Sequence, residues 1–545
     1  MEMVFQIMGG LGLFLYGMTV MGDGLEKSAG EKMKRIIEVL TNNRIMAVGV
    51  GAFVTMIIQS SSATTVMVVG FVNAGIMNLI QATGVIMGAN IGTTVTAQIA
   101  SLDLNEIAPI IVGIAVAVRI FSNNRKTRNF AEIFIGFGIL FIGMDFMKEA
   151  VKPLRNYEGF IKMLLRFGTG DFKDSIFAIL TGFLFTAIVQ SSSATTGILI
   201  ALASEGLLPI EASLPIVFGT NIGTCVTALI SSIGANRTAK RAAIIHLLFN
   251  VIGTIIFIVC FNYITIYLVK TLDPDNAARQ LANAHTFFNL VNTLLLLPFA
   301  TLLVKLANKI IPIKEDEGSE TLGVKYLDNR ILGTPSIAVS QVIKETLNMG
   351  QITLDNFKRS MEAFFKKDEK KIEDVFRYEK IINRMEQEIT NYLVKLSNTT
   401  LSNEHREIVN GLFHTINDIE RVGDHSENIA ELAADAIDNG LHFSQYAIVE
   451  LEEMMKKVIV SYEQALYAMK SGNISAAKKV LEREGEIDSI EKQLRASHIE
   501  RLNNQQCSPQ SGIVFLDIIS NLERIGDHAE NIANAVFETT MKIKR

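Results

Sequence analysis

The sequence predicts an all-α protein: a polytopic membrane domain of two inverted repeats with re-entrant or broken helices, followed by a soluble domain of two tandem helical bundles. Three observations predict this fold class. Long apolar stretches fill residues 1–310. A polar heptapeptide occurs twice inside those stretches. From about residue 340 the apolar positions follow the three and four spacing of amphipathic helices, with a second duplicated motif.

Composition separates a membrane half from a soluble half. The 545 residues are 49% hydrophobic with a mean hydropathy of +0.30, which is long enough for several domains and too apolar for a uniformly soluble chain. The net charge is +5 over residues 1–310 and −10 over 311–545. The three cysteines, Cys225, Cys260 and Cys507, are scattered, so neither a disulfide framework nor a thiolate metal site is expected.

The membrane half consists of two copies of one unit. The heptapeptide Gln59–Thr65 returns letter for letter as Gln190–Thr196, 131 residues later. The segment Gly88–Ala97 returns as Gly219–Ala228 at the same offset. We therefore predict a membrane domain over 1–310 whose copies cover about 1–129 and about 130–310.

The apolar stretches are long enough for membrane spans, since a bilayer core of about 30 Å takes roughly 20 helical residues. They lie near 3–21, 45–73, 76–100, 107–121, 130–147, 175–203, 208–233, 242–268 and 285–310. Those around the repeated motifs carry clusters of Gly, Ser, Thr and Asn. Such clusters are typical of broken helices and re-entrant hairpins that line an enclosed cavity.

Loop charges predict the orientation, because Lys and Arg in short loops favour the cytoplasm. Basic residues place loops 22–44, 122–129 and 234–241 inside, whereas the loop near Asp103 and Glu106 has none and is expected outside. Corresponding loops then face opposite sides, so the copies are predicted to be inverted. Segment 148–173 is basic and disagrees with this scheme. We expect a multi-pass protein of the inner (plasma) membrane with its C-terminal domain in the cytoplasm.

Residues 311–339 are predicted to be a linker, because they are polar and are broken by Gly333-Thr334-Pro335. The following domain, 340–545, is also duplicated. Glu420–Ala430 returns in nearly the same letters as Glu523–Ala533, 103 residues later. Two tandem bundles of about a hundred residues fit this spacing, and each is large enough to bury a core.

These motifs carry two resemblances. The paired QSSS and GxNIGT motifs over roughly 1–310 resemble the type II sodium-dependent phosphate cotransporter family. The two E-R-x-G-D-H-x-E-N-I-A segments resemble a PhoU domain, a pair of three-helix bundles associated with phosphate transport and signalling. The resemblance implies a sodium-coupled secondary transporter that imports inorganic phosphate by alternating access, with a regulatory PhoU-like domain.

The resemblance also implies which residues bind phosphate and sodium. In the heptads they are Gln59, Ser60, Ser61, Ser62, Thr64, Thr65, Gln190, Ser191, Ser192, Ser193, Thr195 and Thr196. Second choices for ion coordination are Asn90, Thr93, Asn221 and Thr224. Physically, helix N-termini and hydroxyls can bind an anion without Lys or Arg, while sodium takes oxygen ligands. Small residues also let membrane helices pack closely, which is the structural alternative for each Ser or Thr.

Acidic residues four apart in the soluble half are candidate metal ligands. Like charges at that helical spacing repel unless a cation lies between them. By resemblance to PhoU domains, iron or zinc is expected at Glu420, Asp424, Glu484, Asp488, Glu523 and Asp527. A fourth segment has Asn383 four residues after Glu379, where the pattern requires an acid. The alternative is a solvated face whose acids pair with Arg421 and Arg524.

Glycine is unfavourable inside a helix by about 1 kcal/mol relative to Ala. Gly423 and Gly526 therefore indicate close approach of another helix or of a ligand. His246 and His285 are expected to be interfacial or hydrogen-bonded core residues.

Two other functions remain open at this stage: transport of another oxyanion such as sulfate, and a membrane-anchored metal-binding adaptor in phosphate signalling. An enzyme is not expected, because the chain has no Walker motif, nucleophile elbow or HExxH. The expected partners are inorganic phosphate, sodium and the lipid bilayer, with no nucleic acid. A homo-oligomer or a cytoplasmic regulatory partner is also expected.

Overall fold

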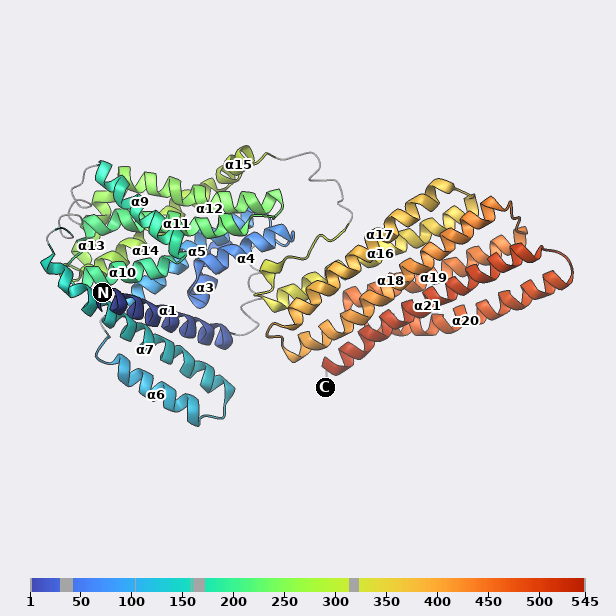
Figure 1. Cartoon of the computed structure of the whole chain (residues 1–545), viewed down its shortest axis with the longest axis horizontal. Helices are drawn as coiled ribbons and strands as arrows, with labels where there is room; N and C mark the ends of the chain where they lie inside the picture. The colour runs from blue at the N-terminus through green and yellow to red at the C-terminus, as the bar shows by residue number, and fades with distance from the viewer. Residues whose placement is uncertain are drawn as a thin grey trace. The chain divides into compact units, whose positions relative to one another are not determined.

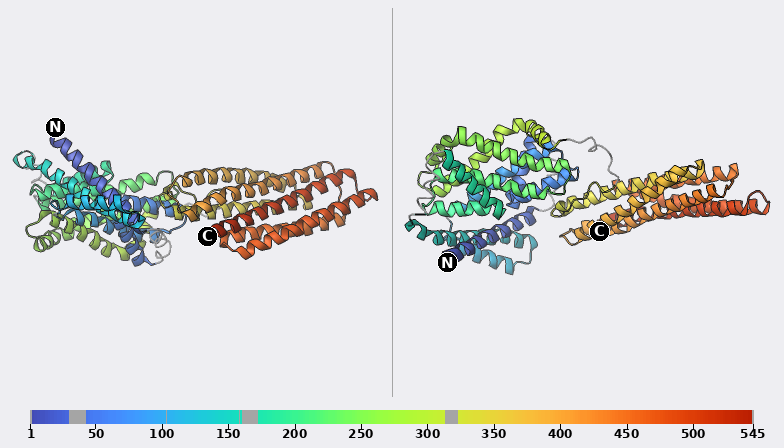
Figure 2. Two further views of the ribbon diagram at one scale, coloured as in Figure 1. Left: turned by 90° about the horizontal axis from the view of Figure 1, so that it is seen from below. Right: turned by 45° about the horizontal axis from the view of Figure 1, so that its top comes forward.

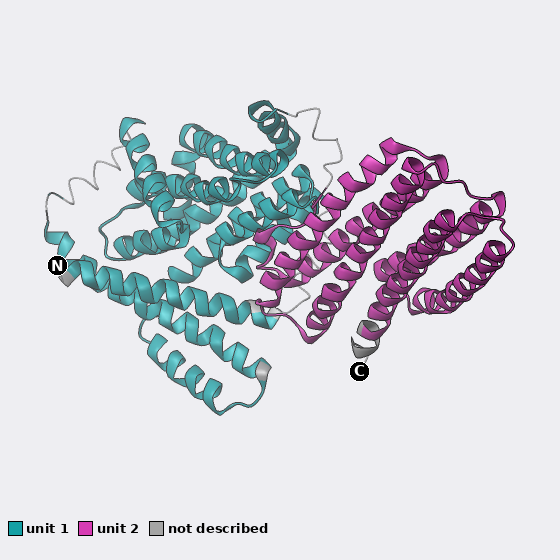
Figure 3. Cartoon of the chain, turned by 45° about the vertical axis from the view of Figure 1, so that its right-hand side comes forward, with its two compact units in different colours: residues 1–317 teal, residues 318–545 magenta. Residues whose placement is uncertain are grey.

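The computed structural model describes residues 2–29, 43–102, 104–157, 159, 172–312 and 323–543. Within these ranges the chain is helical almost throughout and has no strand, which confirms the predicted all-α class. The chain divides into two compact units, Met1–Glu317 and Gly318–Arg545 (Figure 3).

Unit 1 is built from membrane-type helices. Its α-helices are α1 (Glu2–Ala29), α3 (Arg44–Ile58), α4 (Ser61–Asn73), α5 (Leu79–Ala100), α6 (Ala108–Phe121), α7 (Arg125–Val151), α9 (Phe172–Val189), α10 (Ser192–Ser204), α11 (Ile210–Ser231), α12 (Arg237–Ile256), α13 (Asn262–Leu272), α14 (Ala277–Leu296) and α15 (Ala300–Ile310). Short η1 (Lys152–Asn156), η2 (Phe257–Phe261) and η3 (Leu297–Phe299) extend α7, α12 and α14. Six candidate spans are long and apolar enough to cross a membrane within the described residues: Met3–Leu25, Lys126–Asn156, Phe172–Val189, Ile210–Ser231, Arg237–Leu272 and Ala277–Ile310.

Each heptad breaks a helix, as the sequence predicts. The stretch near 45–73 divides into α3 and α4, and the stretch near 175–203 divides into α9 and α10. At both breaks the glutamine adopts the left-handed conformation, with φ of 59° at Gln59 and 56° at Gln190. The next residue, Ser60 or Ser191, is an extended N-cap whose hydroxyl accepts a hydrogen bond from the N–H three residues later.

Glycine contacts repeat position by position between the copies. A Cβ added to Gly88 of α5 would lie 2.0 Å from the Val48 carbonyl oxygen of α3. A Cβ on Gly219 of α11 would lie 2.0 Å from the Ile179 carbonyl oxygen of α9. Gly88 and Gly219 are 131 residues apart in sequence, and so are Val48 and Ile179. The two copies therefore share one packing geometry, while their inverted orientation stays a prediction because the structure contains no membrane.

Helix α1 packs along α7, and α7 packs against α6 (Figure 1). Phe14 of α1 and Phe141 of α7 are fully buried in the core cluster that this pair forms with α10. This packing fixes one face of α1 beside the second heptad. The predicted basic loops 22–44 and 148–173 lie partly outside the described residues.

Unit 2 consists of two three-helix bundles, which confirms the predicted pair of tandem helical bundles. Its helices are η5 (Asn329–Ile331), α16 (Pro335–Lys366), α17 (Glu369–Ser397), α18 (Asn403–Asp438), α19 (Gln445–Ser471), α20 (Ile474–Asn503) and α21 (Pro509–Ile543). Helices α16 to α18 pack together, as do α19 to α21, and α18 joins α21 across the two bundles. Figure 2 shows these long helices running alongside one another.

Within the stretch 311–339 that is predicted to be a linker, the structure places η5 and the first residues of α16. Helix α16 begins at Pro335, because proline is well suited to the first helical turn. Lys325 and Tyr326 precede this helix, and their backbone N–H groups donate hydrogen bonds to Glu345 of α16. Polar composition alone could not reveal that this segment binds back onto unit 2. Residues 313–322 lie outside the described residues.

The glycine contact between α3 and α5 gives a testable prediction. Gly88→Ala places a methyl group against the Val48 carbonyl, and such overpacking destabilises by about 1–3 kcal/mol. Thermal unfolding of the purified full chain in detergent should show a melting temperature several degrees lower. The control is Gly49→Ala in α3, where nothing lies within 4 Å of an added Cβ. Equal melting temperatures for the two variants would contradict this packing.

Candidate functional site

A pocket of about 420 Å³ lies between the two helix breaks of unit 1. The glutamine and three serines of each heptad line it: Gln59, Ser60, Ser61, Ser62, Gln190, Ser191, Ser192 and Ser193. Ile58 of α3 and one face of α1, namely Leu15, Met18, Thr19 and Asp23, complete the lining. The structure therefore brings both heptads together at a single cavity.

The pocket lies at the N-termini of two helices. Helix α4 begins at Ser61 and α10 begins at Ser192, and both first turns line the cavity. The first N–H groups of a helix have no intrahelical acceptor, and its N-terminus carries a positive partial charge of about half an elementary charge. Two such ends at one cavity form an anion site that needs no basic side chain.

The heptad threonines support the break instead of lining the pocket. Thr64 is hydrogen-bonded to Thr55 of α3 at 3.0 Å, and Thr195 is hydrogen-bonded to Thr186 of α9 at 2.9 Å. Thr65 donates to the Ser61 carbonyl. The Thr55–Thr64 and Thr186–Thr195 bonds join each half-helix to the helix that precedes it. Thr196 is buried, and its Oγ1 has no partner within the described chain.

The two heptads differ at their glutamines. Gln59 is buried, and its Oε1 accepts a hydrogen bond of 2.8 Å from Thr96 of α5. Gln190 is exposed, and the equivalent of Thr96 in the second copy, Thr227, keeps a buried Oγ1 without a partner in the described residues. The break at Gln59 is therefore hydrogen-bonded to α5, whereas the break at Gln190 lacks the equivalent hydrogen bond to α11.

Asp23 is a pocket residue that the sequence pattern did not reveal. It is the one ionisable side chain that lines the cavity in the described part of the chain, and no Lys or Arg does so. Nothing in its local sequence marks it, because Asp23 lies near the end of α1, far from the repeated motifs. The spacing of Leu15, Thr19 and Asp23, four residues apart, places them on one helical face but does not show what that face contacts.

The four second-choice residues lie outside the pocket lining. Asn90 donates to the Ile86 carbonyl of its own helix, and Thr224 donates to the Asn221 carbonyl. The Asn221 amide is engaged by Asn289 at 2.9 Å and by His285 at 3.1 Å. Thr93 is buried in α5. We find no shared cavity with the heptads for these residues.

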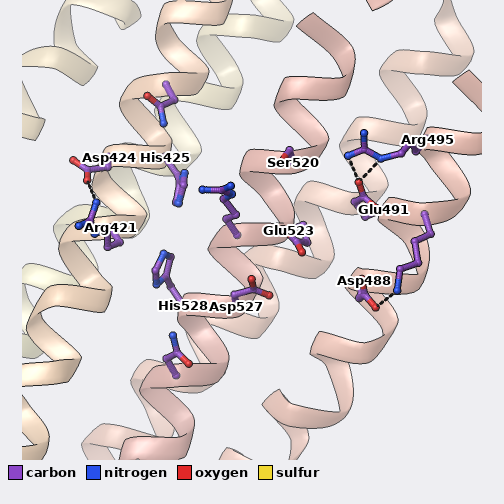
Figure 4. A pocket seen from close by; sticks show the side chains of 14 residues that line it. Arg421, Asp424, His425, Asp488, Glu491, Arg495, Ser520, Glu523, Asp527 and His528 are labelled. Carbon is purple, nitrogen blue, oxygen red and sulfur yellow. Dashed lines mark hydrogen bonds and ion pairs between the residues drawn. The ribbon is translucent and has the colours of Figure 1, made fainter. Parts of the chain in front are cut away.

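Unit 2 has a second polar cavity, of about 910 Å³, between α18, α20 and α21. Figure 4 shows His425 and His528 facing each other at its centre, with their ring centroids 5.5 Å apart. His528 pairs with Asp418 at 2.9 Å, and His425 is hydrogen-bonded to Asn521 at 2.8 Å. Asp418 and Asn521 are 103 residues apart, so they occupy equivalent positions of the duplicated bundles.

Four of the six predicted metal ligands line this cavity: Asp424, Asp488, Glu523 and Asp527. Glu420 and Glu484 do not. Two of the four are in ion pairs, Asp424 with Arg421 at 3.4 Å and Asp488 with Lys492 at 2.6 Å. Across the described residues, no three His, Cys, Asp or Glu side chains are grouped closely enough to hold a metal ion as they stand.

A buried carboxyl group lies beside the first acidic segment. Glu379 of α17 is 1% exposed, and neither of its carboxyl oxygens has a partner in the described chain. Burial, followed by repulsion from Asp424, Glu427 and Glu420, raises the pKa of Glu379 to about 8. Its Oε2 would lie 2.6 Å from a Cβ on Gly423, so this glycine permits the close approach.

The second acidic segment behaves differently. A Cβ on Gly526 would meet only Ile487 at an ordinary 3.4 Å, so this glycine is not required by contact. Burial and the neighbouring Asp527 raise the pKa of Glu523, and burial also raises the pKa of Glu484 and of Glu420. These carboxyl groups therefore keep their protons to higher pH than free ones, unless a cation joins them.

The apolar helices of unit 1 are typical of a multi-pass membrane protein, and unit 2 adds a second helical unit. The model of the Na+/Pi-cotransporter family matches residues 13–149 and 161–292, and the PhoU domain model matches 346–433 and 451–536. The chain belongs to the Na+/Pi-cotransporter family and carries a PhoU domain, as the motifs predict.

Individual relatives agree with this assignment. The chain is 23% identical over 537 residues, 98% of its own length and 97% of the relative, to YjbB of Escherichia coli (strain K12), which is provisionally named an inorganic phosphate export protein. It is 30% identical to the uncharacterized protein YqeW of Bacillus subtilis (strain 168), over 55% of this chain and 96% of that one. Over 202 residues, 36% of this chain and 90% of the relative, it is 26% identical to a PhoU homolog of the phosphate-specific transport system of Clostridium acetobutylicum.

The raised pKa of Glu379 predicts a pH-dependent stability. Its pKa is about 8 when folded against 4.5 as the reference value, so the folded chain retains a proton that the unfolded chain loses between these pH values. Stability is then full below about 4.5 and falls as pH rises to about 8. Glu379→Gln removes this titration, so in EDTA the variant should melt above wild type at pH 8.

Thermal unfolding of the full chain between pH 5 and pH 8 measures this effect. Glu373→Gln, which changes an exposed carboxyl group of the same helix, is the control and should follow wild type. If Glu379→Gln shows the same pH dependence as wild type, the buried carboxyl group does not govern stability.

Proposed function

We propose that this protein is a secondary transporter that moves inorganic phosphate together with sodium ions through the pocket between α4 and α10. One observation carries the proposal: two helix N-termini and six serines meet at a cavity that no Lys or Arg of the described chain lines. Such a site can bind an anion through N–H and O–H donors and helix dipoles. Family membership supports phosphate as that anion.

Electrostatics supports the sodium requirement. Phosphate carries one to two negative charges, and Asp23 adds another at the pocket. Asp23 is exposed at the pocket, and it repels a second negative charge beside it unless a cation lies between them. Sodium held by oxygen ligands, with Asp23 among them, would raise phosphate affinity, and phosphate would raise sodium affinity by the same factor. That reciprocity is the coupling which cotransport requires.

The difference between the two glutamines supports alternating access. At the first break Gln59 accepts a hydrogen bond from Thr96, whereas at the second break Thr227 has no such bond with Gln190. Two repeats that rock against each other would differ in this way in one of their two states. In the opposite state Gln190 would bond to Thr227, and Gln59 would be released. The hydrogen bond is exchanged between copies, so neither state loses it overall.

The direction of net transport follows from the gradients, because a secondary transporter is reversible. With sodium higher outside, cotransport brings phosphate in, and this is the direction we propose. Export is the second candidate, since the name of the E. coli relative refers to phosphate export. Sulfate is tested as a competing oxyanion in the same assay.

For unit 2 we propose a regulatory role in the cytoplasm that depends on bound iron or zinc. The buried, unpartnered carboxyl group of Glu379 beside Glu420 and Asp424 fits a cation, because a cation would supply the missing partner and remove the repulsion. Asn383 would contribute an amide oxygen in place of a carboxylate. The relatives named as phosphate transport accessory proteins support regulation. A homo-oligomer or a cytoplasmic partner would receive the signal.

The proposal predicts sodium-dependent uptake that requires Asp23. Proteoliposomes of the full chain should take up labelled phosphate with an inward sodium gradient and lose most of this uptake when potassium replaces sodium. Asp23→Asn removes a charged cation ligand, so the sodium concentration at half-maximal uptake should rise about tenfold, equivalent to ~1.4 kcal/mol. Asp145→Asn changes an exposed acid of α7 outside the pocket and serves as the control.

Undiminished uptake without sodium would refute cotransport. Stronger competition by sulfate than by unlabelled phosphate would refute phosphate as the substrate. Uptake that is driven only by an outward sodium gradient would favour exchange and export.

The exchanged hydrogen bond gives a separate prediction. Thr96→Val and Thr227→Val each remove one hydroxyl at equivalent positions, so each should destabilise a different state of the carrier. We expect opposite changes in the accessibility of a cysteine placed at Ser62, measured from the two sides of the membrane by thiol labelling. Identical changes in both variants would contradict alternating use of the two glutamines.

A further inference from the structure

A buried polar seam crosses unit 1 between α12 and α14, away from the heptad pocket. Helix α12 contributes His246, Asn250 and Thr254 at four-residue spacing, so they share one helical face. Helix α14 contributes Asn292, which is fully buried. His246, Asn250 and Thr254 are at most 4% exposed. None of these residues lines the heptad pocket.

Part of the seam is satisfied by bonds within the protein. The Asn250 amide nitrogen lies 3.1 Å from the His246 carbonyl and 3.3 Å from Cys225 Sγ of α11. The Asn292 amide nitrogen lies 3.4 Å from the Phe249 carbonyl. These bonds use the Nδ2 atom of each amide, so they fix which side of the amide is nitrogen. They do not involve either Oδ1 atom.

The oxygen atoms of the seam are left without donors. Asn250 Oδ1, Thr254 Oγ1 and Asn292 Oδ1 are buried and have no partner in the described residues. Both ring nitrogens of His246 are also buried and have no hydrogen-bond partner in the described residues. Buried polar groups carry a large free-energy cost unless they are bonded, and lipid offers no partner. Several such atoms in one place indicate a ligand or ordered water.

The Asn292 amide lies directly against Gly253, a residue of α12 close in sequence to Asn250 and Thr254. A Cβ on Gly253 would lie 2.2 Å from Asn292 Nδ2 and 2.4 Å from Asn292 Oδ1, so the amide of α14 rests directly on α12 there. On α12, Asn250 lies three residues before Gly253, and Thr254 lies directly after it. The side chain of Asn292 therefore packs against the turn of α12 that carries Asn250 and Thr254.

The backbone beside this glycine is also irregular. The five residues Phe257–Phe261 form a π-helical turn directly after α12. The Phe257 N–H is shared between the carbonyls of Gly253 and Thr254. π-Helical turns inside α-helices occur frequently at functional sites.

We propose that Asn250, Thr254 and Asn292 bind a monovalent cation of the sodium class, at a site separate from the heptad pocket. The unpartnered atoms of these three side chains are neutral oxygens, which are the ligands that hard cations prefer. The seam residues include no carboxylate, so a divalent ion would lack charge compensation. An anion would face acceptor atoms. This site deepens the sodium coupling proposed above by giving one sodium ion a place that does not compete with phosphate.

Sodium binding without phosphate tests the site. The full chain is purified in detergent, and its melting temperature is followed by size exclusion after heating, while sodium chloride replaces choline chloride at constant ionic strength. Wild type should be stabilised by sodium and not by potassium. Thr254→Val and Asn292→Leu keep the side-chain shape and remove one ligand each. Each should raise the half-saturating sodium concentration at least tenfold.

Thr265→Val is the matched control, since Thr265 is a buried threonine of α13 whose hydroxyl is bonded to the Phe261 carbonyl. It should titrate as wild type does. If Asn292→Leu does not fold, the sodium titration of Thr254→Val tests the site by itself. This variant is expected to fold, because a single methyl group replaces the hydroxyl of Thr254. Wild-type protein that shows no sodium-specific stabilisation, or Thr254→Val that titrates as wild type, overturns the proposal.

Phosphate uptake by the same preparations separates this inference from the proposed function. Uptake that needs sodium, combined with unchanged titrations in both variants, overturns the seam site and leaves cotransport standing. Uptake that does not need sodium, combined with a loss of sodium stabilisation in Thr254→Val, supports the seam site and overturns the coupling.

Discussion

The breaks at Gln59 and Gln190 determine the rest of unit 1. A helix interrupted inside an apolar layer leaves backbone N–H groups that lipid cannot bond, so such a break persists only where protein or a solute supplies partners. Here both breaks open on one cavity, and both restart with a serine cap at the N-terminus of a half-helix. The glycine contacts of α3 with α5 and of α9 with α11 hold the broken segments in place. The anion site that we propose would be a consequence of this constraint.

Duplication supplies the second requirement of a carrier, which is two arrangements of similar energy. The copies match at the capping serines, the threonine pairs and the glycine contacts, all 131 residues apart. They differ at the bond between Gln59 and Thr96, which has no counterpart between Gln190 and Thr227. In the alternating-access cycle that we propose, the hydrogen bond would pass from one copy to the other at small net cost in free energy. A single asymmetric site would have to lose a hydrogen bond to open.

Much of the fold and eight of the residues that line the heptad pocket could be predicted from the sequence, because both depend on repeated motifs. Identical letters at a fixed offset identified both helix breaks, and the spacing of apolar residues identified the helical bundles of unit 2. The roles of Asp23 and Glu379 could not be predicted. Asp23 reaches the pocket only because α1 packs on α7, and the environment of Glu379 depends on how closely α17 approaches Gly423. Long-range packing decides such residues, and no local pattern encodes it.

Electron cryomicroscopy of the full chain in sodium phosphate, compared with choline phosphate, tests the central claim most directly. The account predicts density for one tetrahedral anion between the first turns of α4 and α10 in sodium, and its loss or marked weakening in choline. Anion density of equal strength in both conditions, or density located away from Ser61 and Ser192, would contradict it.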